Sequence, residues 1–300
     1  MLAGNKDIFH LSHSMDMNML FRLYALTCLA MIAFAANSVF CRLALVDGSN
    51  DPISFTVVRL LAGAIILFYF FIRQAKSEPL IINFKSFGLP LLLFSYALFF
   101  SLAYVEIDAG TGALILFSTV QLTMMIISIS RGHMLNRIEW CGFLMAMGGL
   151  IYLLFPGLSA PPLTAAILMT ISGISRGFYS ALGQKTNNPV LQTSRNFVLL
   201  VPVCFLLALI FPIQLTMEGY MWAILSGALT SGLGYVVWYA VLKELATSTA
   251  AIGQLSVPAI AALGGILFLD ERLSTRLVIA TLIILSGIII KIRASHQNKI

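Results

Sequence analysis

The stretches YVEIDAGTGALILFS, residues 104–118, and LKELATSTAAIGQLS, residues 242–256, are two versions of one pattern and set the architecture of the chain. They align at a constant offset of 138 residues, which places Glu106 over Glu244. Matches between apolar residues arise easily by chance in a strongly hydrophobic chain, so the polar and glycine pairs are the better evidence for an internal repeat. Further identities at this offset are Thr111/Thr249, Ala113/Ala251, Ser118/Ser256, Leu135/Leu273, Gly149/Gly287, Ile151/Ile289 and Phe40/Phe178.

Composition indicates the class of protein around these stretches. Of 300 residues, 59% are hydrophobic and 10% charged, whereas a soluble domain carries about 25% charged residues. A spanning helix needs about 20 mostly apolar residues, and no run alternates with the period of two that a membrane barrel requires. We therefore expect an all-α polytopic membrane protein whose ten spans are 21–46, 53–72, 86–104, 109–129, 139–155, 162–183, 196–212, 218–242, 247–269 and 275–292.

The repeat and the span count together predict an inverted repeat. The two halves, 21–155 and 162–292, each hold five spans, and an odd number makes the second half enter the membrane from the opposite side. Many secondary transporters have this architecture, with the substrate site near the midplane between the repeats. Residues 1–20 and 293–300 are then expected to be short cytoplasmic tails.

The positions of Lys and Arg predict the orientation. With the N-terminus in the cytoplasm, thirteen of these residues fall on the cytoplasmic side and two, Arg272 and Arg276, on the outer side. We expect an inner-membrane protein with both termini in the cytoplasm. Residues 23–35 also resemble a signal peptide, but the long polar leader and the continuing apolar run favour an uncleaved first span.

Other functional classes find no support in the sequence. The net charge of +6 comes from basic residues that flank the spans, which argues against nucleic acid as a partner. There is no pairing of a nucleophile with a base, no metal-ligand cluster and no phosphate-binding loop, so we expect no enzyme activity, no metal and no cofactor. The four cysteines lie in apolar runs, where buried thiols without disulfides are expected. The expected partners are a small-molecule substrate and the lipid bilayer, and the protein is expected to act as a monomer.

Two segments resemble a known family. GALTSGLGYVVWYAVLKELATSTAAIGQLSVPAIAALGGILFLDERLS, residues 227–274, is similar to the last spans of an EamA-type transporter of the drug/metabolite transporter superfamily, and FAANSVFCRLALVDGSNDPISFTVVRLLAGA, residues 34–64, to the start of its first repeat. The resemblance covers about 21–292 and implies ten spans, inverted repeats and efflux of small metabolites or amino acids. The family's Gly-Glu-Arg-Leu turn reads Asp-Glu-Arg-Leu at 270–273 but Gly-His-Met-Leu at 132–135, so His133 stands where the acid would be.

The first two spans contain buried polar residues that need partners. An unpaired amide in hydrocarbon is costly, so Asn37 and Ser38 either bond a neighbouring helix or line a cavity, and the resemblance favours the cavity. Arg42 is expected to snorkel to the outer headgroups. Arg59 is expected at an outer vestibule, where a gate would pair it with one of the nearby acids, which are Asp47, Asp51, Glu106 and Asp108.

Span 162–183 contributes three candidate residues, Ser175, Arg176 and Tyr179. Ser175 and Tyr179 are expected to bind substrate. Arg176 lies nearer the cytoplasmic end, where it either meets an anionic group of a substrate or snorkels to the headgroups. Arg176 is also expected, like Arg59 and Pro258, to be a gate or structural residue.

Spans 218–242 and 247–269 contain aromatic and amide candidates. Tyr235 and Tyr239 share a helix face with Trp238 beside them, which fits either a substrate-stacking wall or an interfacial aromatic belt. Pro258 frees the backbone carbonyl of Gln254, which is tolerable only beside protein or water. Gln254 and Ser256 flank this weak point, and Gln121 lies in the equivalent span of the first half, so we expect these three residues to line a central site. The alternative is that Pro258 makes a simple packing kink.

We therefore expect an exporter that works by alternating access. Its expected substrates are small amphipathic metabolites, in the first place amino acids or related compounds. The alternatives are an efflux protein for organic cations, which would want a membrane-embedded carboxylate that the spans lack, and a metabolite uptake permease.

Overall fold

The computed structural model describes residues 4–74, 87–132, 134–157, 160–183, 188–245 and 247–297, and within these ranges it consists of helices and connecting turns. The expected all-α class is confirmed for the described part. The first half contains α1 (Gly4–Leu45), α2 (Pro52–Gln74), α3 (Gly88–Ala103), α4 (Ala109–Ser130) and α5 (Arg137–Leu154). The second half contains α6 (Leu163–Gly183), α7 (Pro189–Ile210), α8 (Met217–Ile224), η2 (Leu225–Leu233), α9 (Gly234–Leu242), α10 (Thr247–Gln254), α11 (Val257–Leu269) and α12 (Thr275–Gln297).

These helices fill the ten expected ranges. In the second half, α8, η2 and α9 together make one pass, and α10 and α11 make another. Among the described residues, eight passes are long and apolar enough to cross a membrane, whereas α3 is a shorter apolar helix and α6 carries Arg176 and several hydroxyl residues. The eight are Met19–Leu45, Pro52–Arg73, Ala109–Ser130, Arg137–Leu154, Pro189–Ile210, Met217–Leu242, Thr249–Leu269 and Thr275–Ala294.

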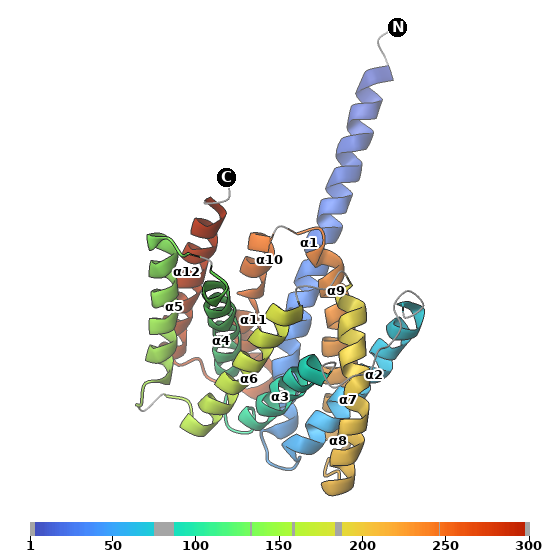
Figure 1. The fold of residues 1–300 in the computed structure, drawn as a ribbon, viewed down its shortest axis with the longest axis vertical. Helices are drawn as coiled ribbons and strands as arrows, with labels where there is room; N and C mark the ends of the chain where they lie inside the picture. Colours follow the sequence, from blue (N-terminus) through green and yellow to red (C-terminus); the bar gives the residue numbers. More distant parts are fainter. Residues whose placement is uncertain are drawn as a thin grey trace.

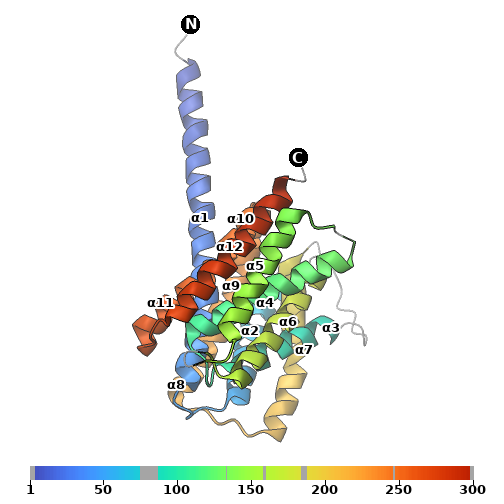
Figure 2. The ribbon, with the colours of Figure 1, turned by 90° about the vertical axis from the view of Figure 1, so that its left-hand side faces the viewer.

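Two expected boundaries differ from the structure. The seventh pass was expected from residue 196, but α7 begins at Pro189 because Asn188 caps it, accepting a hydrogen bond from the Leu191 N–H at 3.1 Å. The segment expected as an N-terminal tail continues α1 as helix from Gly4, beyond the bundle. Both ends of the chain lie at the same end of the molecule (Figure 1 and Figure 2).

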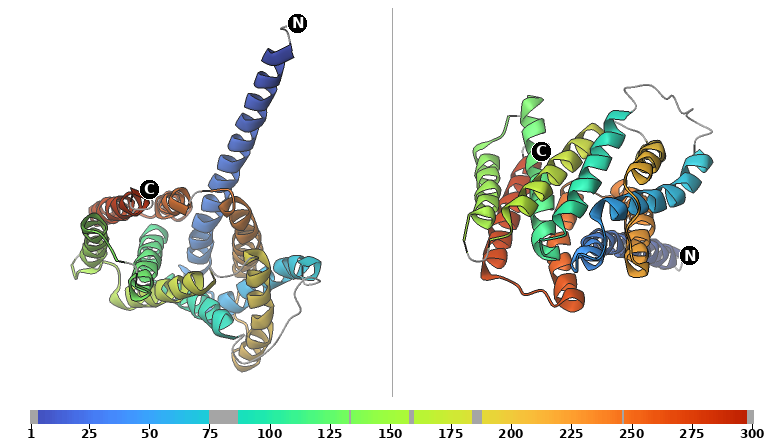
Figure 3. Two further views of the ribbon diagram at one scale, coloured as in Figure 1. Left: turned by 45° about the horizontal axis from the view of Figure 1, so that its top comes forward. Right: turned by 90° about the horizontal axis from the view of Figure 1, so that it is seen from below.

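The helix contacts repeat between the halves. α5 packs along α12 at one edge of the bundle, and α2 packs along α7 towards the opposite edge (Figure 1 and Figure 3). α6 packs on α3 and α4, and α1 makes the corresponding contacts with α8–η2–α9 and α11. Exchanging the first to fifth passes of one half with those of the other therefore leaves this contact pattern unchanged.

Glycines permit the closest of these crossings. A Cβ atom on Gly142 of α5 would lie 2.5 Å from the Gly287 carbonyl oxygen of α12. A Cβ atom on Gly227 of η2 would collide with the backbone carbonyl of Arg59 in α2. The backbones of these helices touch directly, which is how membrane helices gain packing energy without a hydrophobic driving force.

Two passes of the second half are not regular α-helices. Residues 225–233 wind as a π-helix, a form that is rare and often marks functional sites. The α-helix breaks at Leu255–Ser256, between α10 and α11, with Pro258 in the first turn of α11. The helix disturbance expected from Pro258 is therefore present, and Gln254 is the last residue before the break.

Candidate functional site

A cavity of about 310 Å³ lies between α4, α6, α7, α9 and α10. Its lining includes Gly183, Pro189 and Leu242, which stand at helix ends on the side of the molecule where both termini lie. The cavity therefore extends towards the terminal side. Its remaining lining residues are Phe117, Val120, Gln121, Met124, Arg176, Tyr179, Ser180, Gln192, Thr193, Asn196, Tyr235, Trp238, Tyr239, Ala250, Ala251 and Gln254.

Arg176 provides the charge of this cavity. Its guanidinium donates a hydrogen bond to the Tyr235 hydroxyl and lies 4.9 Å from the centre of the Tyr96 ring and 5.2 Å from that of Tyr235. The described lining contains no Asp, Glu or His. The aromatic rings stabilise the cation, but no acid of the described lining neutralises it, so this part of the cavity wall carries one net positive charge.

A chain of hydroxyl and amide groups forms one wall. The Asn196 amide donates to the Tyr179 hydroxyl at 3.0 Å, and Thr193 donates to the Tyr239 hydroxyl at 3.2 Å. The Gln192 amide in turn donates to Asn196 at 3.0 Å. Sequence reasoning missed the three α7 residues because Gln192 and Thr193 were assigned to a loop and Asn196 was only the first residue of the expected span. The spacing of Gln192 and Asn196, one helical turn apart, was the available signal.

The aromatic residues of α9 face this cavity. Tyr235 and Tyr239 stack with ring centres 6.0 Å apart and an interplanar angle of 18°, and Trp238 lines the cavity beside them. All three aromatic residues therefore line the cavity, and their role in stacking on a substrate stays a prediction. Gln121 and Gln254 line the same cavity from opposite halves of the chain.

A second, much smaller pocket of about 10 Å³ lies deeper in the molecule, with room for about one water molecule. It shares Phe117, Arg176 and Tyr235 with the large cavity and is lined further by Asn37 and Ser38. The Asn37 side-chain oxygen accepts hydrogen bonds from two η2 hydroxyls, Ser226 at 2.6 Å and Thr230 at 3.2 Å. Asn37 thus both joins two helices and lines the pocket, so the two alternatives are not exclusive.

Three candidates lie elsewhere. The Ser175 hydroxyl pairs with Ser95 at 2.9 Å in the α3–α6 contact, outside either pocket. Ser256 is exposed and donates to the Gly253 carbonyl within its own turn, so it does not line the site. Pro258 is buried at the start of α11, where it shapes the helix break and lines neither pocket.

The expected pairing of Arg59 with an outer acid is wrong. Arg59 is 2% exposed, and its guanidinium lies 4.9 Å from the centre of the Phe100 ring and 5.8 Å from that of Tyr96. Within the described ranges, Arg59 forms no ion pair with an acid. Its charge is held by aromatic faces because the acids remain in the loops beyond it.

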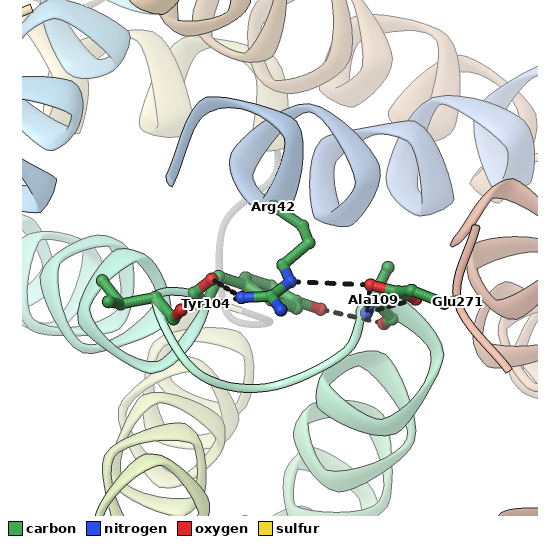
Figure 4. A network of polar contacts seen from close by, with 5 residues as sticks. Arg42, Tyr104, Ala109 and Glu271 are labelled. Atoms are coloured by element: carbon green, nitrogen blue, oxygen red, sulfur yellow. Dashed lines mark hydrogen bonds and ion pairs between the residues drawn. The ribbon is translucent and has the colours of Figure 1, made fainter. Parts of the chain in front are cut away.

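Arg42 makes the ion pair instead, at the end of the molecule opposite the termini. Its Nε lies 3.5 Å from a carboxylate oxygen of Glu271, with both side chains 11% exposed, and its guanidinium donates to the carbonyl oxygens of Tyr104 and Val105 at 3.0 and 2.7 Å (Figure 4). Snorkelling of Arg42 to the headgroups is therefore incorrect. Glu271 belongs to the family-like turn of the second half; its first-half counterpart, His133, lies outside the described residues.

The environment of Glu271 changes its acidity. Partial burial raises the pKa of its carboxyl above the ordinary value of 4.5, and the nearby Asp108 adds to the increase. The Ala109 N–H, which donates to both carboxylate oxygens at 3.0 Å, and the Arg42 guanidinium oppose it. Burial outweighs these two contacts, so the pKa stays raised.

Comparison with known proteins finds relatives that span most of this chain. The chain is 46% identical over 270 residues to an uncharacterized protein of Pseudomonas aeruginosa, covering 89% of this chain and 93% of that one. It is 22% identical to the uncharacterized transporter YoaV of Bacillus subtilis, covering 83% and 90%, and 22% identical to an uncharacterized transporter of Archaeoglobus fulgidus, covering 91% and 98%.

A solved crystal structure shares the fold with a TM-score of 0.59 at 15% identity, covering 88% of this chain and 95% of that chain. The model of the EamA-like transporter family matches twice, over residues 22–155 and again over 163–293, so one family pattern accounts for each half. This chain therefore belongs to the EamA-like transporter family, within the drug/metabolite transporter superfamily, and is a multi-pass membrane transporter.

Proposed function

We propose that this transporter exports small carboxylate-bearing metabolites, with amino acids and related amphipathic compounds as the best candidates. The observation that carries the proposal is Arg176, a cation in a cavity whose described lining holds no acid. A substrate carboxylate would neutralise it, and a hydrogen bond to a charged group contributes about 1.5–3 kcal/mol. The Arg176 guanidinium donates to the Tyr235 hydroxyl. A substrate carboxylate would be a stronger acceptor and would replace this hydrogen bond.

The rest of the lining suits an amphipathic molecule. Trp238 and the Tyr235–Tyr239 stack offer aromatic faces for an apolar side chain or, by cation–π contact, for an ammonium group. The amide oxygens of Gln121 and Gln254 are further acceptors for an ammonium group. An organic cation without a carboxylate would meet the charge of Arg176 unopposed, so the cation-efflux alternative is disfavoured.

Alternating access between two inverted five-helix repeats is the proposed mechanism. It is supported by the family pattern that matches each half, by helix contacts that survive exchange of the halves, and by five passes in each half. The excess of Lys and Arg on the terminal side supports an inner-membrane protein with cytoplasmic termini. In that orientation the cavity faces the cytoplasm, as loading for export requires; a permease for uptake would use the same cavity in reverse.

Transport into proteoliposomes tests the proposal. Radiolabelled amino acids should show saturable flux, and a dye cation should show none. Arg176→Gln should raise the KM for the transported amino acid about 10- to 100-fold, which corresponds to the loss of one charge-assisted hydrogen bond. Arg131→Gln, at the exposed end of α4, is the matched control and should leave the KM unchanged.

Saturable flux of the dye cation without flux of any amino acid would reverse the choice of substrate. An unchanged KM in Arg176→Gln, with flux intact, would remove the arginine from substrate binding. Both variants are to be compared at equal levels of reconstituted protein, so that poor insertion is not read as loss of binding.

A further inference from the structure

We infer that Arg42, Glu271 and the N-terminus of α4 form a gate that closes the transport route at the end opposite the cavity. The inference rests on the proposed function, because a gate needs a route. Residues along helix α4 contact the gate, the small pocket and the cavity in turn, so this helix runs beside the route. Ala109 contacts Glu271, Leu116 and Phe117 line the small pocket, and Gln121 lines the cavity.

The distance along this route follows from the helix rise of about 1.5 Å per residue, which separates Ala109 from Gln121 by roughly 18 Å. Along α4, the small pocket therefore lies beyond the cavity, and the gate lies beyond the small pocket. Helix α1 gives the same order, since Arg42 lies one turn beyond Ser38, a residue of the small pocket.

The gate joins three segments from both halves of the chain. The Arg42 guanidinium binds the turn after α3 through the carbonyls of Tyr104 and Val105, and it pairs with Glu271 from the turn after α11. Glu271 in turn accepts hydrogen bonds from the Ala109 N–H (Figure 4). A substrate leaving at this end must pass where these segments meet, so the contacts among them have to break.

The local backbone is shaped to hold this carboxylate. The Glu271 N–H donates to the Gly265 carbonyl at 3.1 Å, which folds the turn back on α11. A Cβ atom on Gly265 would collide with the Glu271 carboxylate. Gly265→Ala should therefore displace the carboxylate without changing any charge, because a flexible side-chain end moves more easily than backbone.

The net free energy of the Arg42–Glu271 ion pair is expected to be small, which would allow the gate to open repeatedly. For a pair that is mostly buried, the cost of desolvation offsets much of the attraction, whereas removal of one partner leaves an uncompensated charge. Arg42→Gln should thus favour the open gate. The double variant Arg42→Gln/Glu271→Gln should return towards the parent, because it also removes the stranded carboxylate.

Cys41 is a built-in reporter of opening. It is 0% exposed, immediately precedes Arg42 and lies about one turn from Ser38, which lines the small pocket. The parent protein for the test keeps Cys41 and replaces the other three cysteines, of which Cys28 and Cys141 are exposed, contrary to the expectation of buried thiols, and Cys204 is buried. A membrane-impermeant methanethiosulfonate reagent is applied from the outer side to the full-length protein in sealed vesicles of known orientation.

We expect Cys41 to be modified about tenfold faster in Arg42→Gln than in the parent, equivalent to about 1.4 kcal/mol in favour of the open gate. Gly265→Ala should also be faster, and the double variant should be slower than Arg42→Gln. Glu106→Gln and Arg272→Gln change exposed charges in nearby turns and should match the parent.

Modification of Cys41 at the parental rate in both Arg42→Gln and Gly265→Ala would overturn the gate, as would equal acceleration by the two control variants. Gly265→Ala keeps the proposal testable if Arg42→Gln fails to fold, as judged by size-exclusion chromatography. The readout needs no substrate, so its failure is distinct from an unchanged KM in Arg176→Gln, which would contradict only the proposed substrate.

Discussion

The three arginines that the sequence places well within spans, Arg42, Arg59 and Arg176, are each stabilised by different chemistry. Arg42 pairs with a carboxylate and two carbonyl groups, Arg59 lies over aromatic rings, and Arg176 combines rings with a tyrosine hydroxyl. The sequence predicts that each needs a partner, because a charge in an apolar helix is costly. It does not predict which partner, because Glu271 and Tyr235 lie far along the chain and only tertiary packing brings them close.

Lowering the pH on the outer side is expected to favour the closed gate. The pKa of Glu271 is raised above 4.5 when the gate is closed, mainly by burial, and returns to its ordinary value when the open gate exposes it to water. The closed state then binds more protons, so it gains stability as the pH falls through the raised pKa, and the gain is complete below about 4.5.

The charged and titratable groups that face Glu271 from other elements are Arg42 from α1 and Asp108 and Tyr104 from the turn before α4. Asp270 and Arg272 are its neighbours in the chain, and Arg272 is exposed. The measurement is the Cys41 modification rate between pH 7 and pH 5, divided by the rate in Glu271→Gln, which cancels the titration of the thiol. The ratio should fall with pH. A ratio that stays flat or rises on acidification would contradict this role of Glu271.

Among the helical elements, the π-helix η2 was not predictable from the sequence. Its residues LSGALTSGL are compatible with an ordinary α-helix, and the π geometry coincides with the contacts of Ser226 and Thr230 with Asn37. The break between α10 and α11 was predictable, because proline removes a backbone donor and clashes with the preceding turn whatever surrounds it. The effect of a proline on the backbone can therefore be predicted from one sequence, whereas the π winding of η2 cannot.

Gly227→Ala should destabilise the packing of η2 on α2. The added methyl group would collide with the Arg59 carbonyl, which is backbone and cannot turn aside, so overpacking should cost about 1–3 kcal/mol. The melting temperature in detergent is the measurement. Gly148→Ala is the matched control, because its added methyl group meets nothing within 4 Å. Equal melting temperatures for the two variants would show that the α2–η2 crossing tolerates a larger separation.

For the molecule as a whole, the family and the all-helical class were predictable, since the repeated pattern and the apolar runs are properties of the chain itself. Which of the candidate residues line the cavity was less predictable. The α9 aromatics, Gln121 and Gln254 reach the cavity as expected, but Ser175 and Ser256 face other contacts. A short hydroxyl side chain satisfies itself on the nearest carbonyl or hydroxyl, and sequence spacing does not reveal which one is nearest.

The orientation of the whole molecule is also testable. A fluorescent protein that folds only in the cytoplasm should be bright when fused after Ile300, and alkaline phosphatase inserted after Gly48 should be active outside the cell. Both results follow from the excess of Lys and Arg on the terminal side. A dark C-terminal fusion together with an inactive Gly48 insertion would place the cavity on the other side of the membrane.

The ion pair of Arg42 has no charged counterpart in the second half, since the same offset of 138 residues places Ser180, a cavity-lining residue, at the matching position. If the two halves trade conformations, the two mouths of the protein are sealed with unequal strength. In the proposed orientation the idle protein would then rest with its cavity open to the cytoplasm, because the side of Arg42 closes more favourably than the side of Ser180. One arginine in place of one serine would thus bias the resting conformation, whereas the substrate gradient would set the direction of net transport.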